Sequence, residues 1–245
     1  LASSILKIKS LQSLIMDFSN THIGESAIIV LGNAISKMTT LRKFKLRLNE
    51  CEKIGEKALT ELGKTLSKVA LTDLDLTFET SDKIGDKSVT SLCKSLQKMP
   101  KVPGLSNLRL NFQGCETISD VGLTKCVSMF SELTAIERLE MNFNYCSKLT
   151  NSSILSFCNA ISSVRSQSPS LLNLKYLHMS LCSCDKIDDK GITLLGQEIS
   201  KFSDLKTLIL DLKYLEKLTD NALTYLSKFL ARTKIQILYL DFQGN

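Results

Sequence analysis

The stretch LSNLRLNFQGCETISDVGL, residues 105–123, contains both halves of a unit that recurs along the chain. Its first half places apolar residues at offsets 0, 3, 5 and 7 from Leu105, and the last three alternate as a half-buried strand requires. Its second half runs from Gly114 and Cys115 to Ile118, and polar and acidic residues follow before Leu123. We interpret the unit as a short strand, a turn and the beginning of a helix.

The pattern L-x-x-L-x-L-x-F occurs eight times, at intervals of 30, 30, 34, 31, 38, 31 and 30 residues. A period this regular indicates a repeat architecture in which each unit stacks on its neighbours. The copies, and the predicted strands, start near Leu11, Leu41, Leu71, Leu105, Ile136, Leu174, Leu205 and Ile235. The two longest intervals contain the three prolines, so we expect loops around Pro100, Pro103 and Pro169.

A helix is expected to close each repeat. Leu59, Leu62 and Leu66, for example, lie at helical spacing on one face. Glycine-bearing and acidic segments precede such stretches, as in IGDKSV at residues 84–89 and IDDKGI at residues 187–192. We interpret the residues of these segments as N-caps and first-turn carboxylates.

These residues and their spacing resemble the leucine-rich-repeat proteins, of the long-repeat kind seen in ribonuclease-inhibitor-like and cysteine-containing members. The resemblance implies an α/β fold: a right-handed solenoid, or horseshoe, with parallel strands on the concave face and helices on the convex face. The Asn or Cys of the family signature would fall at offset 8, where the chain has Asn49, Asn144 and Cys182 but other residues elsewhere. A column of cysteines lies at offset 10 instead. We therefore expect each strand to run about one pair of residues longer than in the family.

The repeats predict one leucine-rich-repeat domain over residues 1–245. Residues 1–10 look like the end of an earlier helix, and Asn245 stops where the fourth repeat continues to Cys115, so we expect a fragment of a longer solenoid. The longest apolar run, Ala27 to Leu31, is far shorter than the roughly 20 residues that cross a bilayer. Nothing in the sequence predicts a membrane span.

Charge and cysteine content narrow the class of partner and the compartment. The chain has 31 Lys and Arg against 25 Asp and Glu, and 25 of the 31 bases are lysines spread over every segment. Nucleic-acid readers concentrate arginines on one face, so this distribution disfavours a nucleic-acid partner. The eight cysteines occupy turn and helix positions typical of small buried residues, which favours free thiols in a reducing, cytoplasmic compartment.

Two patterns that could carry chemistry are weak. The two histidines, His22 and His178, lie in different repeats without a Ser and Asp partner at motif spacing. Stacked cysteines such as Cys115 and Cys146 could in principle hold zinc, but zinc needs converging tetrahedral ligands, and a line of thiols favours packing. We expect no catalytic residue, no cofactor and no metal.

The outward strand positions, at offsets 2, 4 and 6, are the candidate binding surface because they vary while the buried offsets do not. Lys43, Lys45 and Arg47 predict a basic patch beside the acidic Asp73, Asp75 and Glu79. Tyr176, His178, Tyr214 and Tyr239 form a predicted aromatic cluster. The candidate partner-binding residues of the concave face are Lys45, Arg47, Asp75, Arg109, Glu140, Tyr176, His178, Asp211, Tyr214, Tyr239 and Asp241.

These features favour a non-enzymatic protein-protein interaction or scaffold module within a larger assembly. Family-level analogy implies such settings as a cytoskeletal or ciliary complex, a substrate receptor of ubiquitin ligation, or a regulator of a small GTPase. The alternative is the recognition arm of a multidomain enzyme, such as a kinase or a ubiquitin ligase. Nothing in the residues identifies the protein partner.

Overall fold

The computed structural model describes residues 1–167 and 173–245, which form one parallel sheet of eight strands in sequential order. Each strand pairs only with its neighbours in sequence, as successive turns of a solenoid do. The strands are β1 Ser13–Asp17, β2 Lys43–Arg47, β3 Asp73–Thr77, β4 Asn107–Asn111, β5 Arg138–Asn142, β6 Tyr176–Ser180, β7 Thr207–Asp211 and β8 Ile237–Asp241.

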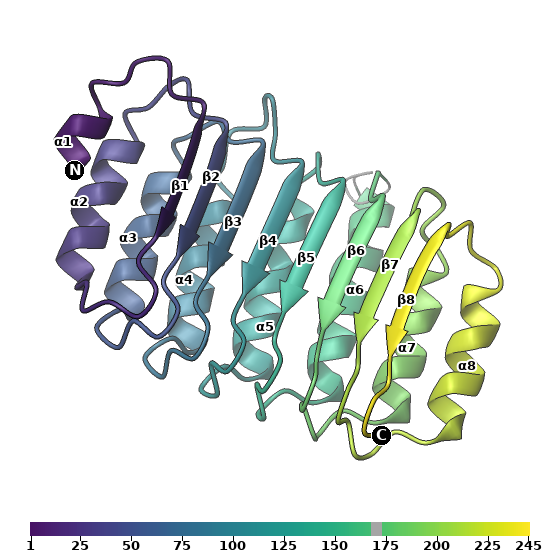
Figure 1. The fold of residues 1–245 in the computed structure, drawn as a ribbon. Coiled ribbons are helices and arrows are strands. Elements are labelled where there is room, and N and C mark those ends of the chain that lie inside the picture. The colour runs from purple at the N-terminus through teal and green to yellow at the C-terminus, as the bar shows by residue number, and fades with distance from the viewer. Residues whose placement is uncertain (168–172) are drawn as a thin grey trace.

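A row of helices packs against one face of this sheet and leaves the opposite face uncovered (Figure 1). The fold is therefore the predicted α/β solenoid, with parallel strands on one face and helices on the other. The helices are α1 Ala2–Ile5, α2 Glu25–Ile35, α3 Glu56–Leu66, α4 Asp86–Leu96, α5 Asp120–Val127, the short 3₁₀ helix η1 Ser128–Ser131, α6 Asn151–Gln167, α7 Asp189–Ile199 and α8 Asp220–Leu230.

Each strand begins two residues after the start of its sequence motif, as with Lys43 after Leu41. The strand starts predicted at the first motif residue are therefore two residues early, because that residue packs in the core where the chain enters the sheet. The strands also end early, yet backbone pairing continues beyond them. Phe18 N–H donates to Arg47 at 3.0 Å and Asn20 N–H donates to Asn49 at 2.9 Å. The strands themselves are thus not extended by the expected pair of residues, and the pairing continues only as backbone hydrogen bonds in the turn.

The core consists of ladders of equivalent residues from successive repeats. The three phenylalanines at offset 7, directly after β3, β4 and β5, stack on one another. The ring centroids are 5.5 Å apart for Phe78 and Phe112 and 5.7 Å apart for Phe112 and Phe143. The offset-10 thiols lie behind them. Cys115 Sγ donates to the carbonyl of Phe78 at 3.1 Å, and Cys146 Sγ donates to that of Phe112 at 3.4 Å. A buried thiol therefore satisfies a carbonyl one repeat earlier.

Acidic residues lie in the first helical turns, as predicted, and Asp188 caps its own helix by accepting from Lys190 N at 2.8 Å. Several first-turn carboxylates also bond to the helix of the next repeat, which the sequence did not indicate. Asp86 is the first residue of α4, but its carboxylate accepts hydrogen bonds from Ser119 N at 2.7 Å and Gly122 N at 3.0 Å, at the start of α5. Asp120 accepts from Thr150 N at 2.8 Å in the same way. Stacking brings the unpaired N–H groups of one helix beside the carboxylate of the previous helix, so these bonds join adjacent repeats.

The predicted loops at Pro100 and Pro103 lie outside helices and strands, as expected, while Pro169 falls outside the described residues. Among the residues that are described, no helix has the length and apolar character needed to cross a bilayer.

Candidate functional site

The uncovered face of the sheet arranges the outward residues in columns that cross the strands. Because the strands pair in register, Lys45, Asp75, Arg109, Glu140 and His178 are direct Cα partners on β2 to β6. Strand spacing places successive members of the column about 4.8 Å apart. The structure thus brings together five of the predicted partner-binding residues.

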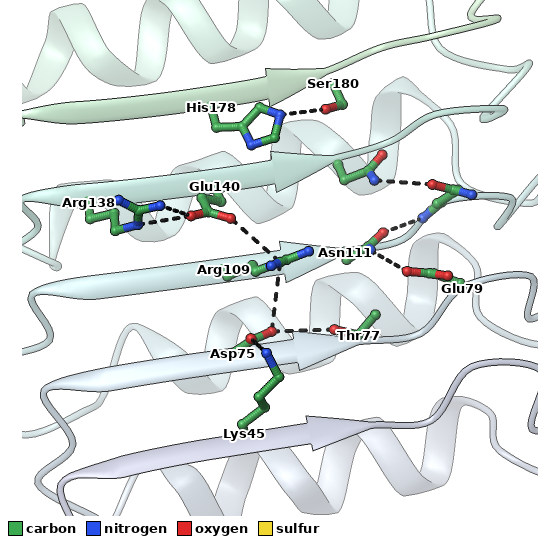
Figure 2. Close-up of polar contacts among 12 residues, drawn as sticks. Lys45, Asp75, Thr77, Glu79, Arg109, Asn111, Arg138, Glu140, His178 and Ser180 are labelled. Carbon is green, nitrogen blue, oxygen red and sulfur yellow. Dashed lines mark hydrogen bonds and ion pairs between the residues drawn. The ribbon is translucent and has the colours of Figure 1, made fainter. Parts of the chain in front are cut away.

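Charged side chains of this column form one continuous network (Figure 2). Asp75 pairs with Lys45, and its Oδ1 lies 3.9 Å from Nε of Arg109. The same Arg109 Nε lies 3.6 Å from Oε2 of Glu140. Arg138 donates to Oε1 of Glu140 from Nε at 2.9 Å and from Nη2 at 2.5 Å. Each of the two carboxylates is therefore shared by two cations.

The basic patch predicted on β2 is divided between different partners. Lys45 turns to Asp75, and Arg47 Nη1 lies 3.3 Å from Oδ2 of Asp17 on β1. Lys43 is exposed and makes no ion pair with any residue that the structure describes. Of the three cations, Lys43 is the one whose charge is left uncompensated.

Tyr176 holds Arg138 from the other side. The guanidinium carbon of Arg138 lies 3.4 Å from the centroid of the Tyr176 ring, a cation-π contact. Burial raises the pKa of Tyr176, so its phenol stays neutral at physiological pH. Arg138 is thereby fixed in place by one carboxylate and one aromatic ring.

The network borders an open hollow of about 350 Å³ over β1 to β5, which we call the concave hollow. Its cationic lining is Lys43, Lys45, Arg109 and Arg138. Its anionic lining is Asp73, Asp75 and Glu140. Ile15, which is well exposed on β1, adds apolar surface at one end.

His178 and Ser180 form a contact that resembles part of a hydrolase site. Nε2 of His178 lies 3.0 Å from Oγ of Ser180 on the same strand. Burial lowers the pKa of His178, which favours the neutral imidazole, although the nearby Glu140 opposes the shift. Ser180 is only 3% exposed, so its hydroxyl has no access to a substrate. The pair accordingly helps to pack the sheet face.

The offset-6 column is less exposed than predicted. Thr77, Asn111 and Ser180 are buried, because these short side chains lie between longer neighbours and bond to them. Asn111 Nδ2 donates to Oε1 of Glu79 at 2.6 Å, and Asn111 Oδ1 accepts from Gln113 N at 3.0 Å. These three residues lie on the uncovered face, as predicted, but their neighbours shield them from solvent (Figure 2).

A geometry that recurs from repeat to repeat explains this column. The N–H at offset 8 lies outside the strand ladder and needs an acceptor of its own. Where offset 6 is Asp or Asn, that side chain accepts, as Asn142 does from Asn144 N at 2.9 Å. Where offset 6 is Ser180, the acceptor is Asn144 of the previous repeat, which receives Cys182 N at 2.8 Å. The sequence signal for this cap is Asp or Asn at offset 6, or Asn at offset 8 of the previous repeat.

Asp211 and Asp241 belong to the same capping scheme. Their Oδ1 atoms accept from Lys213 N at 3.4 Å and from Gln243 N at 3.2 Å. The Lys213 ammonium lies 3.6 Å from both carboxylates, and the Tyr239 hydroxyl donates to Asp241 Oδ2 at 3.0 Å. These predicted binding residues therefore form a second, smaller cluster at the β7 and β8 end of the face.

Tyr214 does not lie on the concave columns, and the predicted aromatic cluster is not assembled around it. It occupies offset 9 in the turn after β7, where its ring lies over Gly244. The residue at this offset has a positive φ in every described repeat, because its N–H continues the ladder while the chain turns away from the sheet. The residues are Asn20, Glu50, Thr80, Gly114, Tyr145, Ser183, Tyr214 and Gly244.

All eight cysteines are free and buried. Burial raises the pKa of Cys115, Cys158 and Cys184 to about 12. Within residues 1–167 and 173–245, no group of three or more His, Cys, Asp or Glu side chains converges as metal ligands would. The thiols that the sequence offered for zinc instead bond to backbone carbonyls.

Comparison with known proteins shows the fold. No protein-family model matches the sequence, and no curated protein matches it. A chain in the crystal structure of the Rad7 and Elc1 complex in yeast is similar over 98% of this chain and 60% of that chain, with a TM-score of 0.54 and 18% sequence identity. The chain thus spans 60% of the length of that neighbour. The actin-binding site 2 of leiomodin-1 is similar over 68% of this chain and 88% of that chain, at a TM-score of 0.49 and 14% identity.

Proposed function

We propose that this chain is a non-enzymatic protein-interaction module that binds a protein partner on its concave face. The observation that carries the proposal is the charged network from Lys45 to Arg138. It places long polar side chains on a rigid sheet, on a face that no helix covers (Figures 1 and 2). Rigid platforms of this kind lose little side-chain entropy when a partner binds.

Two further points support an interaction role. The residues that could suggest catalysis, His178 and Ser180, are engaged with each other, and the serine is buried. The solved neighbour with the higher TM-score comes from a complex of two proteins, Rad7 and Elc1. Free, buried thiols are typical of a reducing compartment, so we propose that the module lies in the cytoplasm. Its proposed setting in a cytoskeletal or ciliary assembly rests on family analogy alone.

The experiment is affinity capture with two matched sets of variants. The concave set is Arg47→Ala, Arg109→Ala and Tyr239→Ala, whose side chains lie on the uncovered sheet face. We expect this set to keep the fold and to weaken partner binding by about 1 to 2 kcal/mol.

The control set is Lys57→Gln, Lys64→Gln and Lys87→Gln, on exposed helix positions. We expect it to change the free energy of unfolding by less than about 0.5 kcal/mol and to keep the partner. If the concave set retains the partner and the helix set loses it, the convex surface carries the interaction and the proposal is wrong.

A further inference from the structure

We infer that the concave hollow is built to hold an acidic peptide segment of the partner. This inference rests on the proposed function, since it names the chemistry of a partner at the same face. The first observation is a layering of charge by depth. The side chains of Asp75 and Glu140 are 20% and 15% exposed, whereas those of Arg109 and Arg138 are 47% and 45% exposed. An approaching molecule therefore meets cations before it meets the carboxylates.

The second observation is that cations at the outer edge of the hollow, which we call the rim cations, have N–H groups without an acceptor among the described residues. Arg109 touches its two carboxylates only through Nε, at 3.6 and 3.9 Å, and its terminal amino groups make no hydrogen bond within the part of the chain that the structure describes. Lys43 makes no ion pair there either. A guanidinium that is anchored on one side and open on the other can donate two hydrogen bonds to a carboxylate of the partner, in a bidentate pair.

The third observation is the balance of charge in the hollow. Its lining has four cations against three carboxylates, so one positive charge is in excess before the depth of the groups is considered. The carboxylates are also those best hydrogen-bonded. Asp73, for example, accepts from Thr72 Oγ1 at 2.6 Å and from Asn107 Nδ2 at 2.7 Å. The buried acids position the cations, and the cations face the partner.

The spacing of the rim cations suits a run of acidic residues. Lys43, Arg109 and Arg138 lie on β2, β4 and β5, so strand spacing separates them by about 10 Å and about 5 Å. An extended chain advances about 3.3 Å per residue and a helix about 5.4 Å per turn, so acidic side chains in either form reach all three cations. Ile15 at the end of the hollow offers contact for an apolar residue beside the acidic run.

A nucleic acid fits this surface less well. Its backbone carries one charge per about 3.4 Å along each strand, and it would place phosphates directly above Asp73, Asp75 and Glu140. In a peptide segment, by contrast, the acidic side chains can be spaced so that each carboxylate lies beside a cation and none lies above an acid. The observations therefore favour an acidic protein segment, and nucleic-acid binding becomes an outcome of the test.

The test uses fluorescence anisotropy with fluorescein-labelled decaglutamate as the probe. The test variant is Lys43→Gln with Arg109→Gln, and the matched control is Lys57→Gln with Lys94→Gln on exposed helix positions, which removes the same charge. We expect the test variant to weaken binding by about tenfold and the control by less than about twofold. Asp75→Asn, which removes a carboxylate beneath the rim, should tighten binding. Circular dichroism on each variant confirms that it is folded.

Three results would overturn the inference. The first is that the folded wild-type chain does not bind decaglutamate. The second is equal weakening in the test and control variants, which would indicate only attraction to the net charge of +6. The third is that oligouridylate binds more tightly than decaglutamate and is lost with the same two side chains. Partner capture by the concave variants separates these failures from a failure of the proposed function, because a non-acidic partner would still be lost on mutation of the concave face.

Discussion

The carboxylate of Asp120, which joins the fourth and fifth repeats, should contribute more to stability than an ordinary surface interaction does. Asp120, the first residue of α5, accepts hydrogen bonds from Thr150 N at 2.8 Å, from Thr150 Oγ1 at 2.6 Å and from Ser153 Oγ. Burial raises the pKa of Asp120, but the bonds from Ser153 and Thr150 outweigh it and hold the pKa below its usual value. The carboxylate therefore binds the start of α6 in its charged form.

The magnitude follows from what Asp120→Ala removes. Loss of an N-cap acceptor costs about 0.5 to 2 kcal/mol, and loss of a negative charge at a helix N-terminus costs about 0.3 to 1 kcal/mol. Part-buried donors left without an acceptor add to this, although water reaches some of them. We expect a decrease of about 2 to 3 kcal/mol in the free energy of unfolding. Asp120→Asn keeps one acceptor and should cost about half as much.

The assay is urea unfolding followed by far-UV circular dichroism, with Asp185→Ala as the control. Asp185 is exposed in a turn, and its carboxylate accepts no hydrogen bond from any described residue, so its loss should cost less than about 0.5 kcal/mol. If Asp120→Ala and Asp185→Ala cost the same, the cap between repeats contributes nothing and the reasoning is refuted.

The pH dependence gives a second readout of the same group. A carboxylate whose pKa is lower in the folded state stabilises the protein above the unfolded pKa of about 3.9. That contribution is lost as the pH falls through the lower folded pKa. The difference in stability between wild type and Asp120→Ala should thus be full near neutrality and shrink in strong acid. A difference that grows as the pH falls below 4 would contradict the assignment.

Three further changes test other parts of the fold. Thr80→Gly should be neutral or stabilise by up to about 1 kcal/mol in urea unfolding, because the β-branched Thr80 is exposed at φ 53° and glycine relieves the strain there. Gly114→Ala, at φ +70° with its new Cβ only 3.2 Å from Thr80 Oγ1, should destabilise by about 1 kcal/mol, and a gain in stability would refute the left-handed turn. Asn144→Ala leaves the Cys182 N–H without its acceptor and should cost about 1 to 3 kcal/mol in thermal unfolding; no measurable change would exclude the cap. Ellman titration should react slowly with the native thiols and fully after denaturation, because burial raises the pKa of Cys115 to about 12; rapid native reaction would disprove this.

The candidate site was only partly readable from the sequence. The column of Lys45, Asp75, Arg109 and Glu140 could be predicted, because equal offsets in a parallel repeat must become neighbours. Tyr214 was misplaced because it lies just past the strand, where the chain leaves the sheet. A side chain that ends at such a turn no longer shares the direction of its strand neighbours.

The sequence by itself determined the repeat, the order of strand and helix in it, and which offsets are buried. Those properties are local: alternation and helical spacing are set within a few residues, and eight copies reinforce one another. Only the tertiary structure decided that Asp86 and Asp120 cap the following helix and that Asp75 and Glu140 lie deeper than Arg109. The physical reason is that stacking brings residues about 30 positions apart into contact, so the partner and the depth of each charge depend on the side chains of the adjacent repeats.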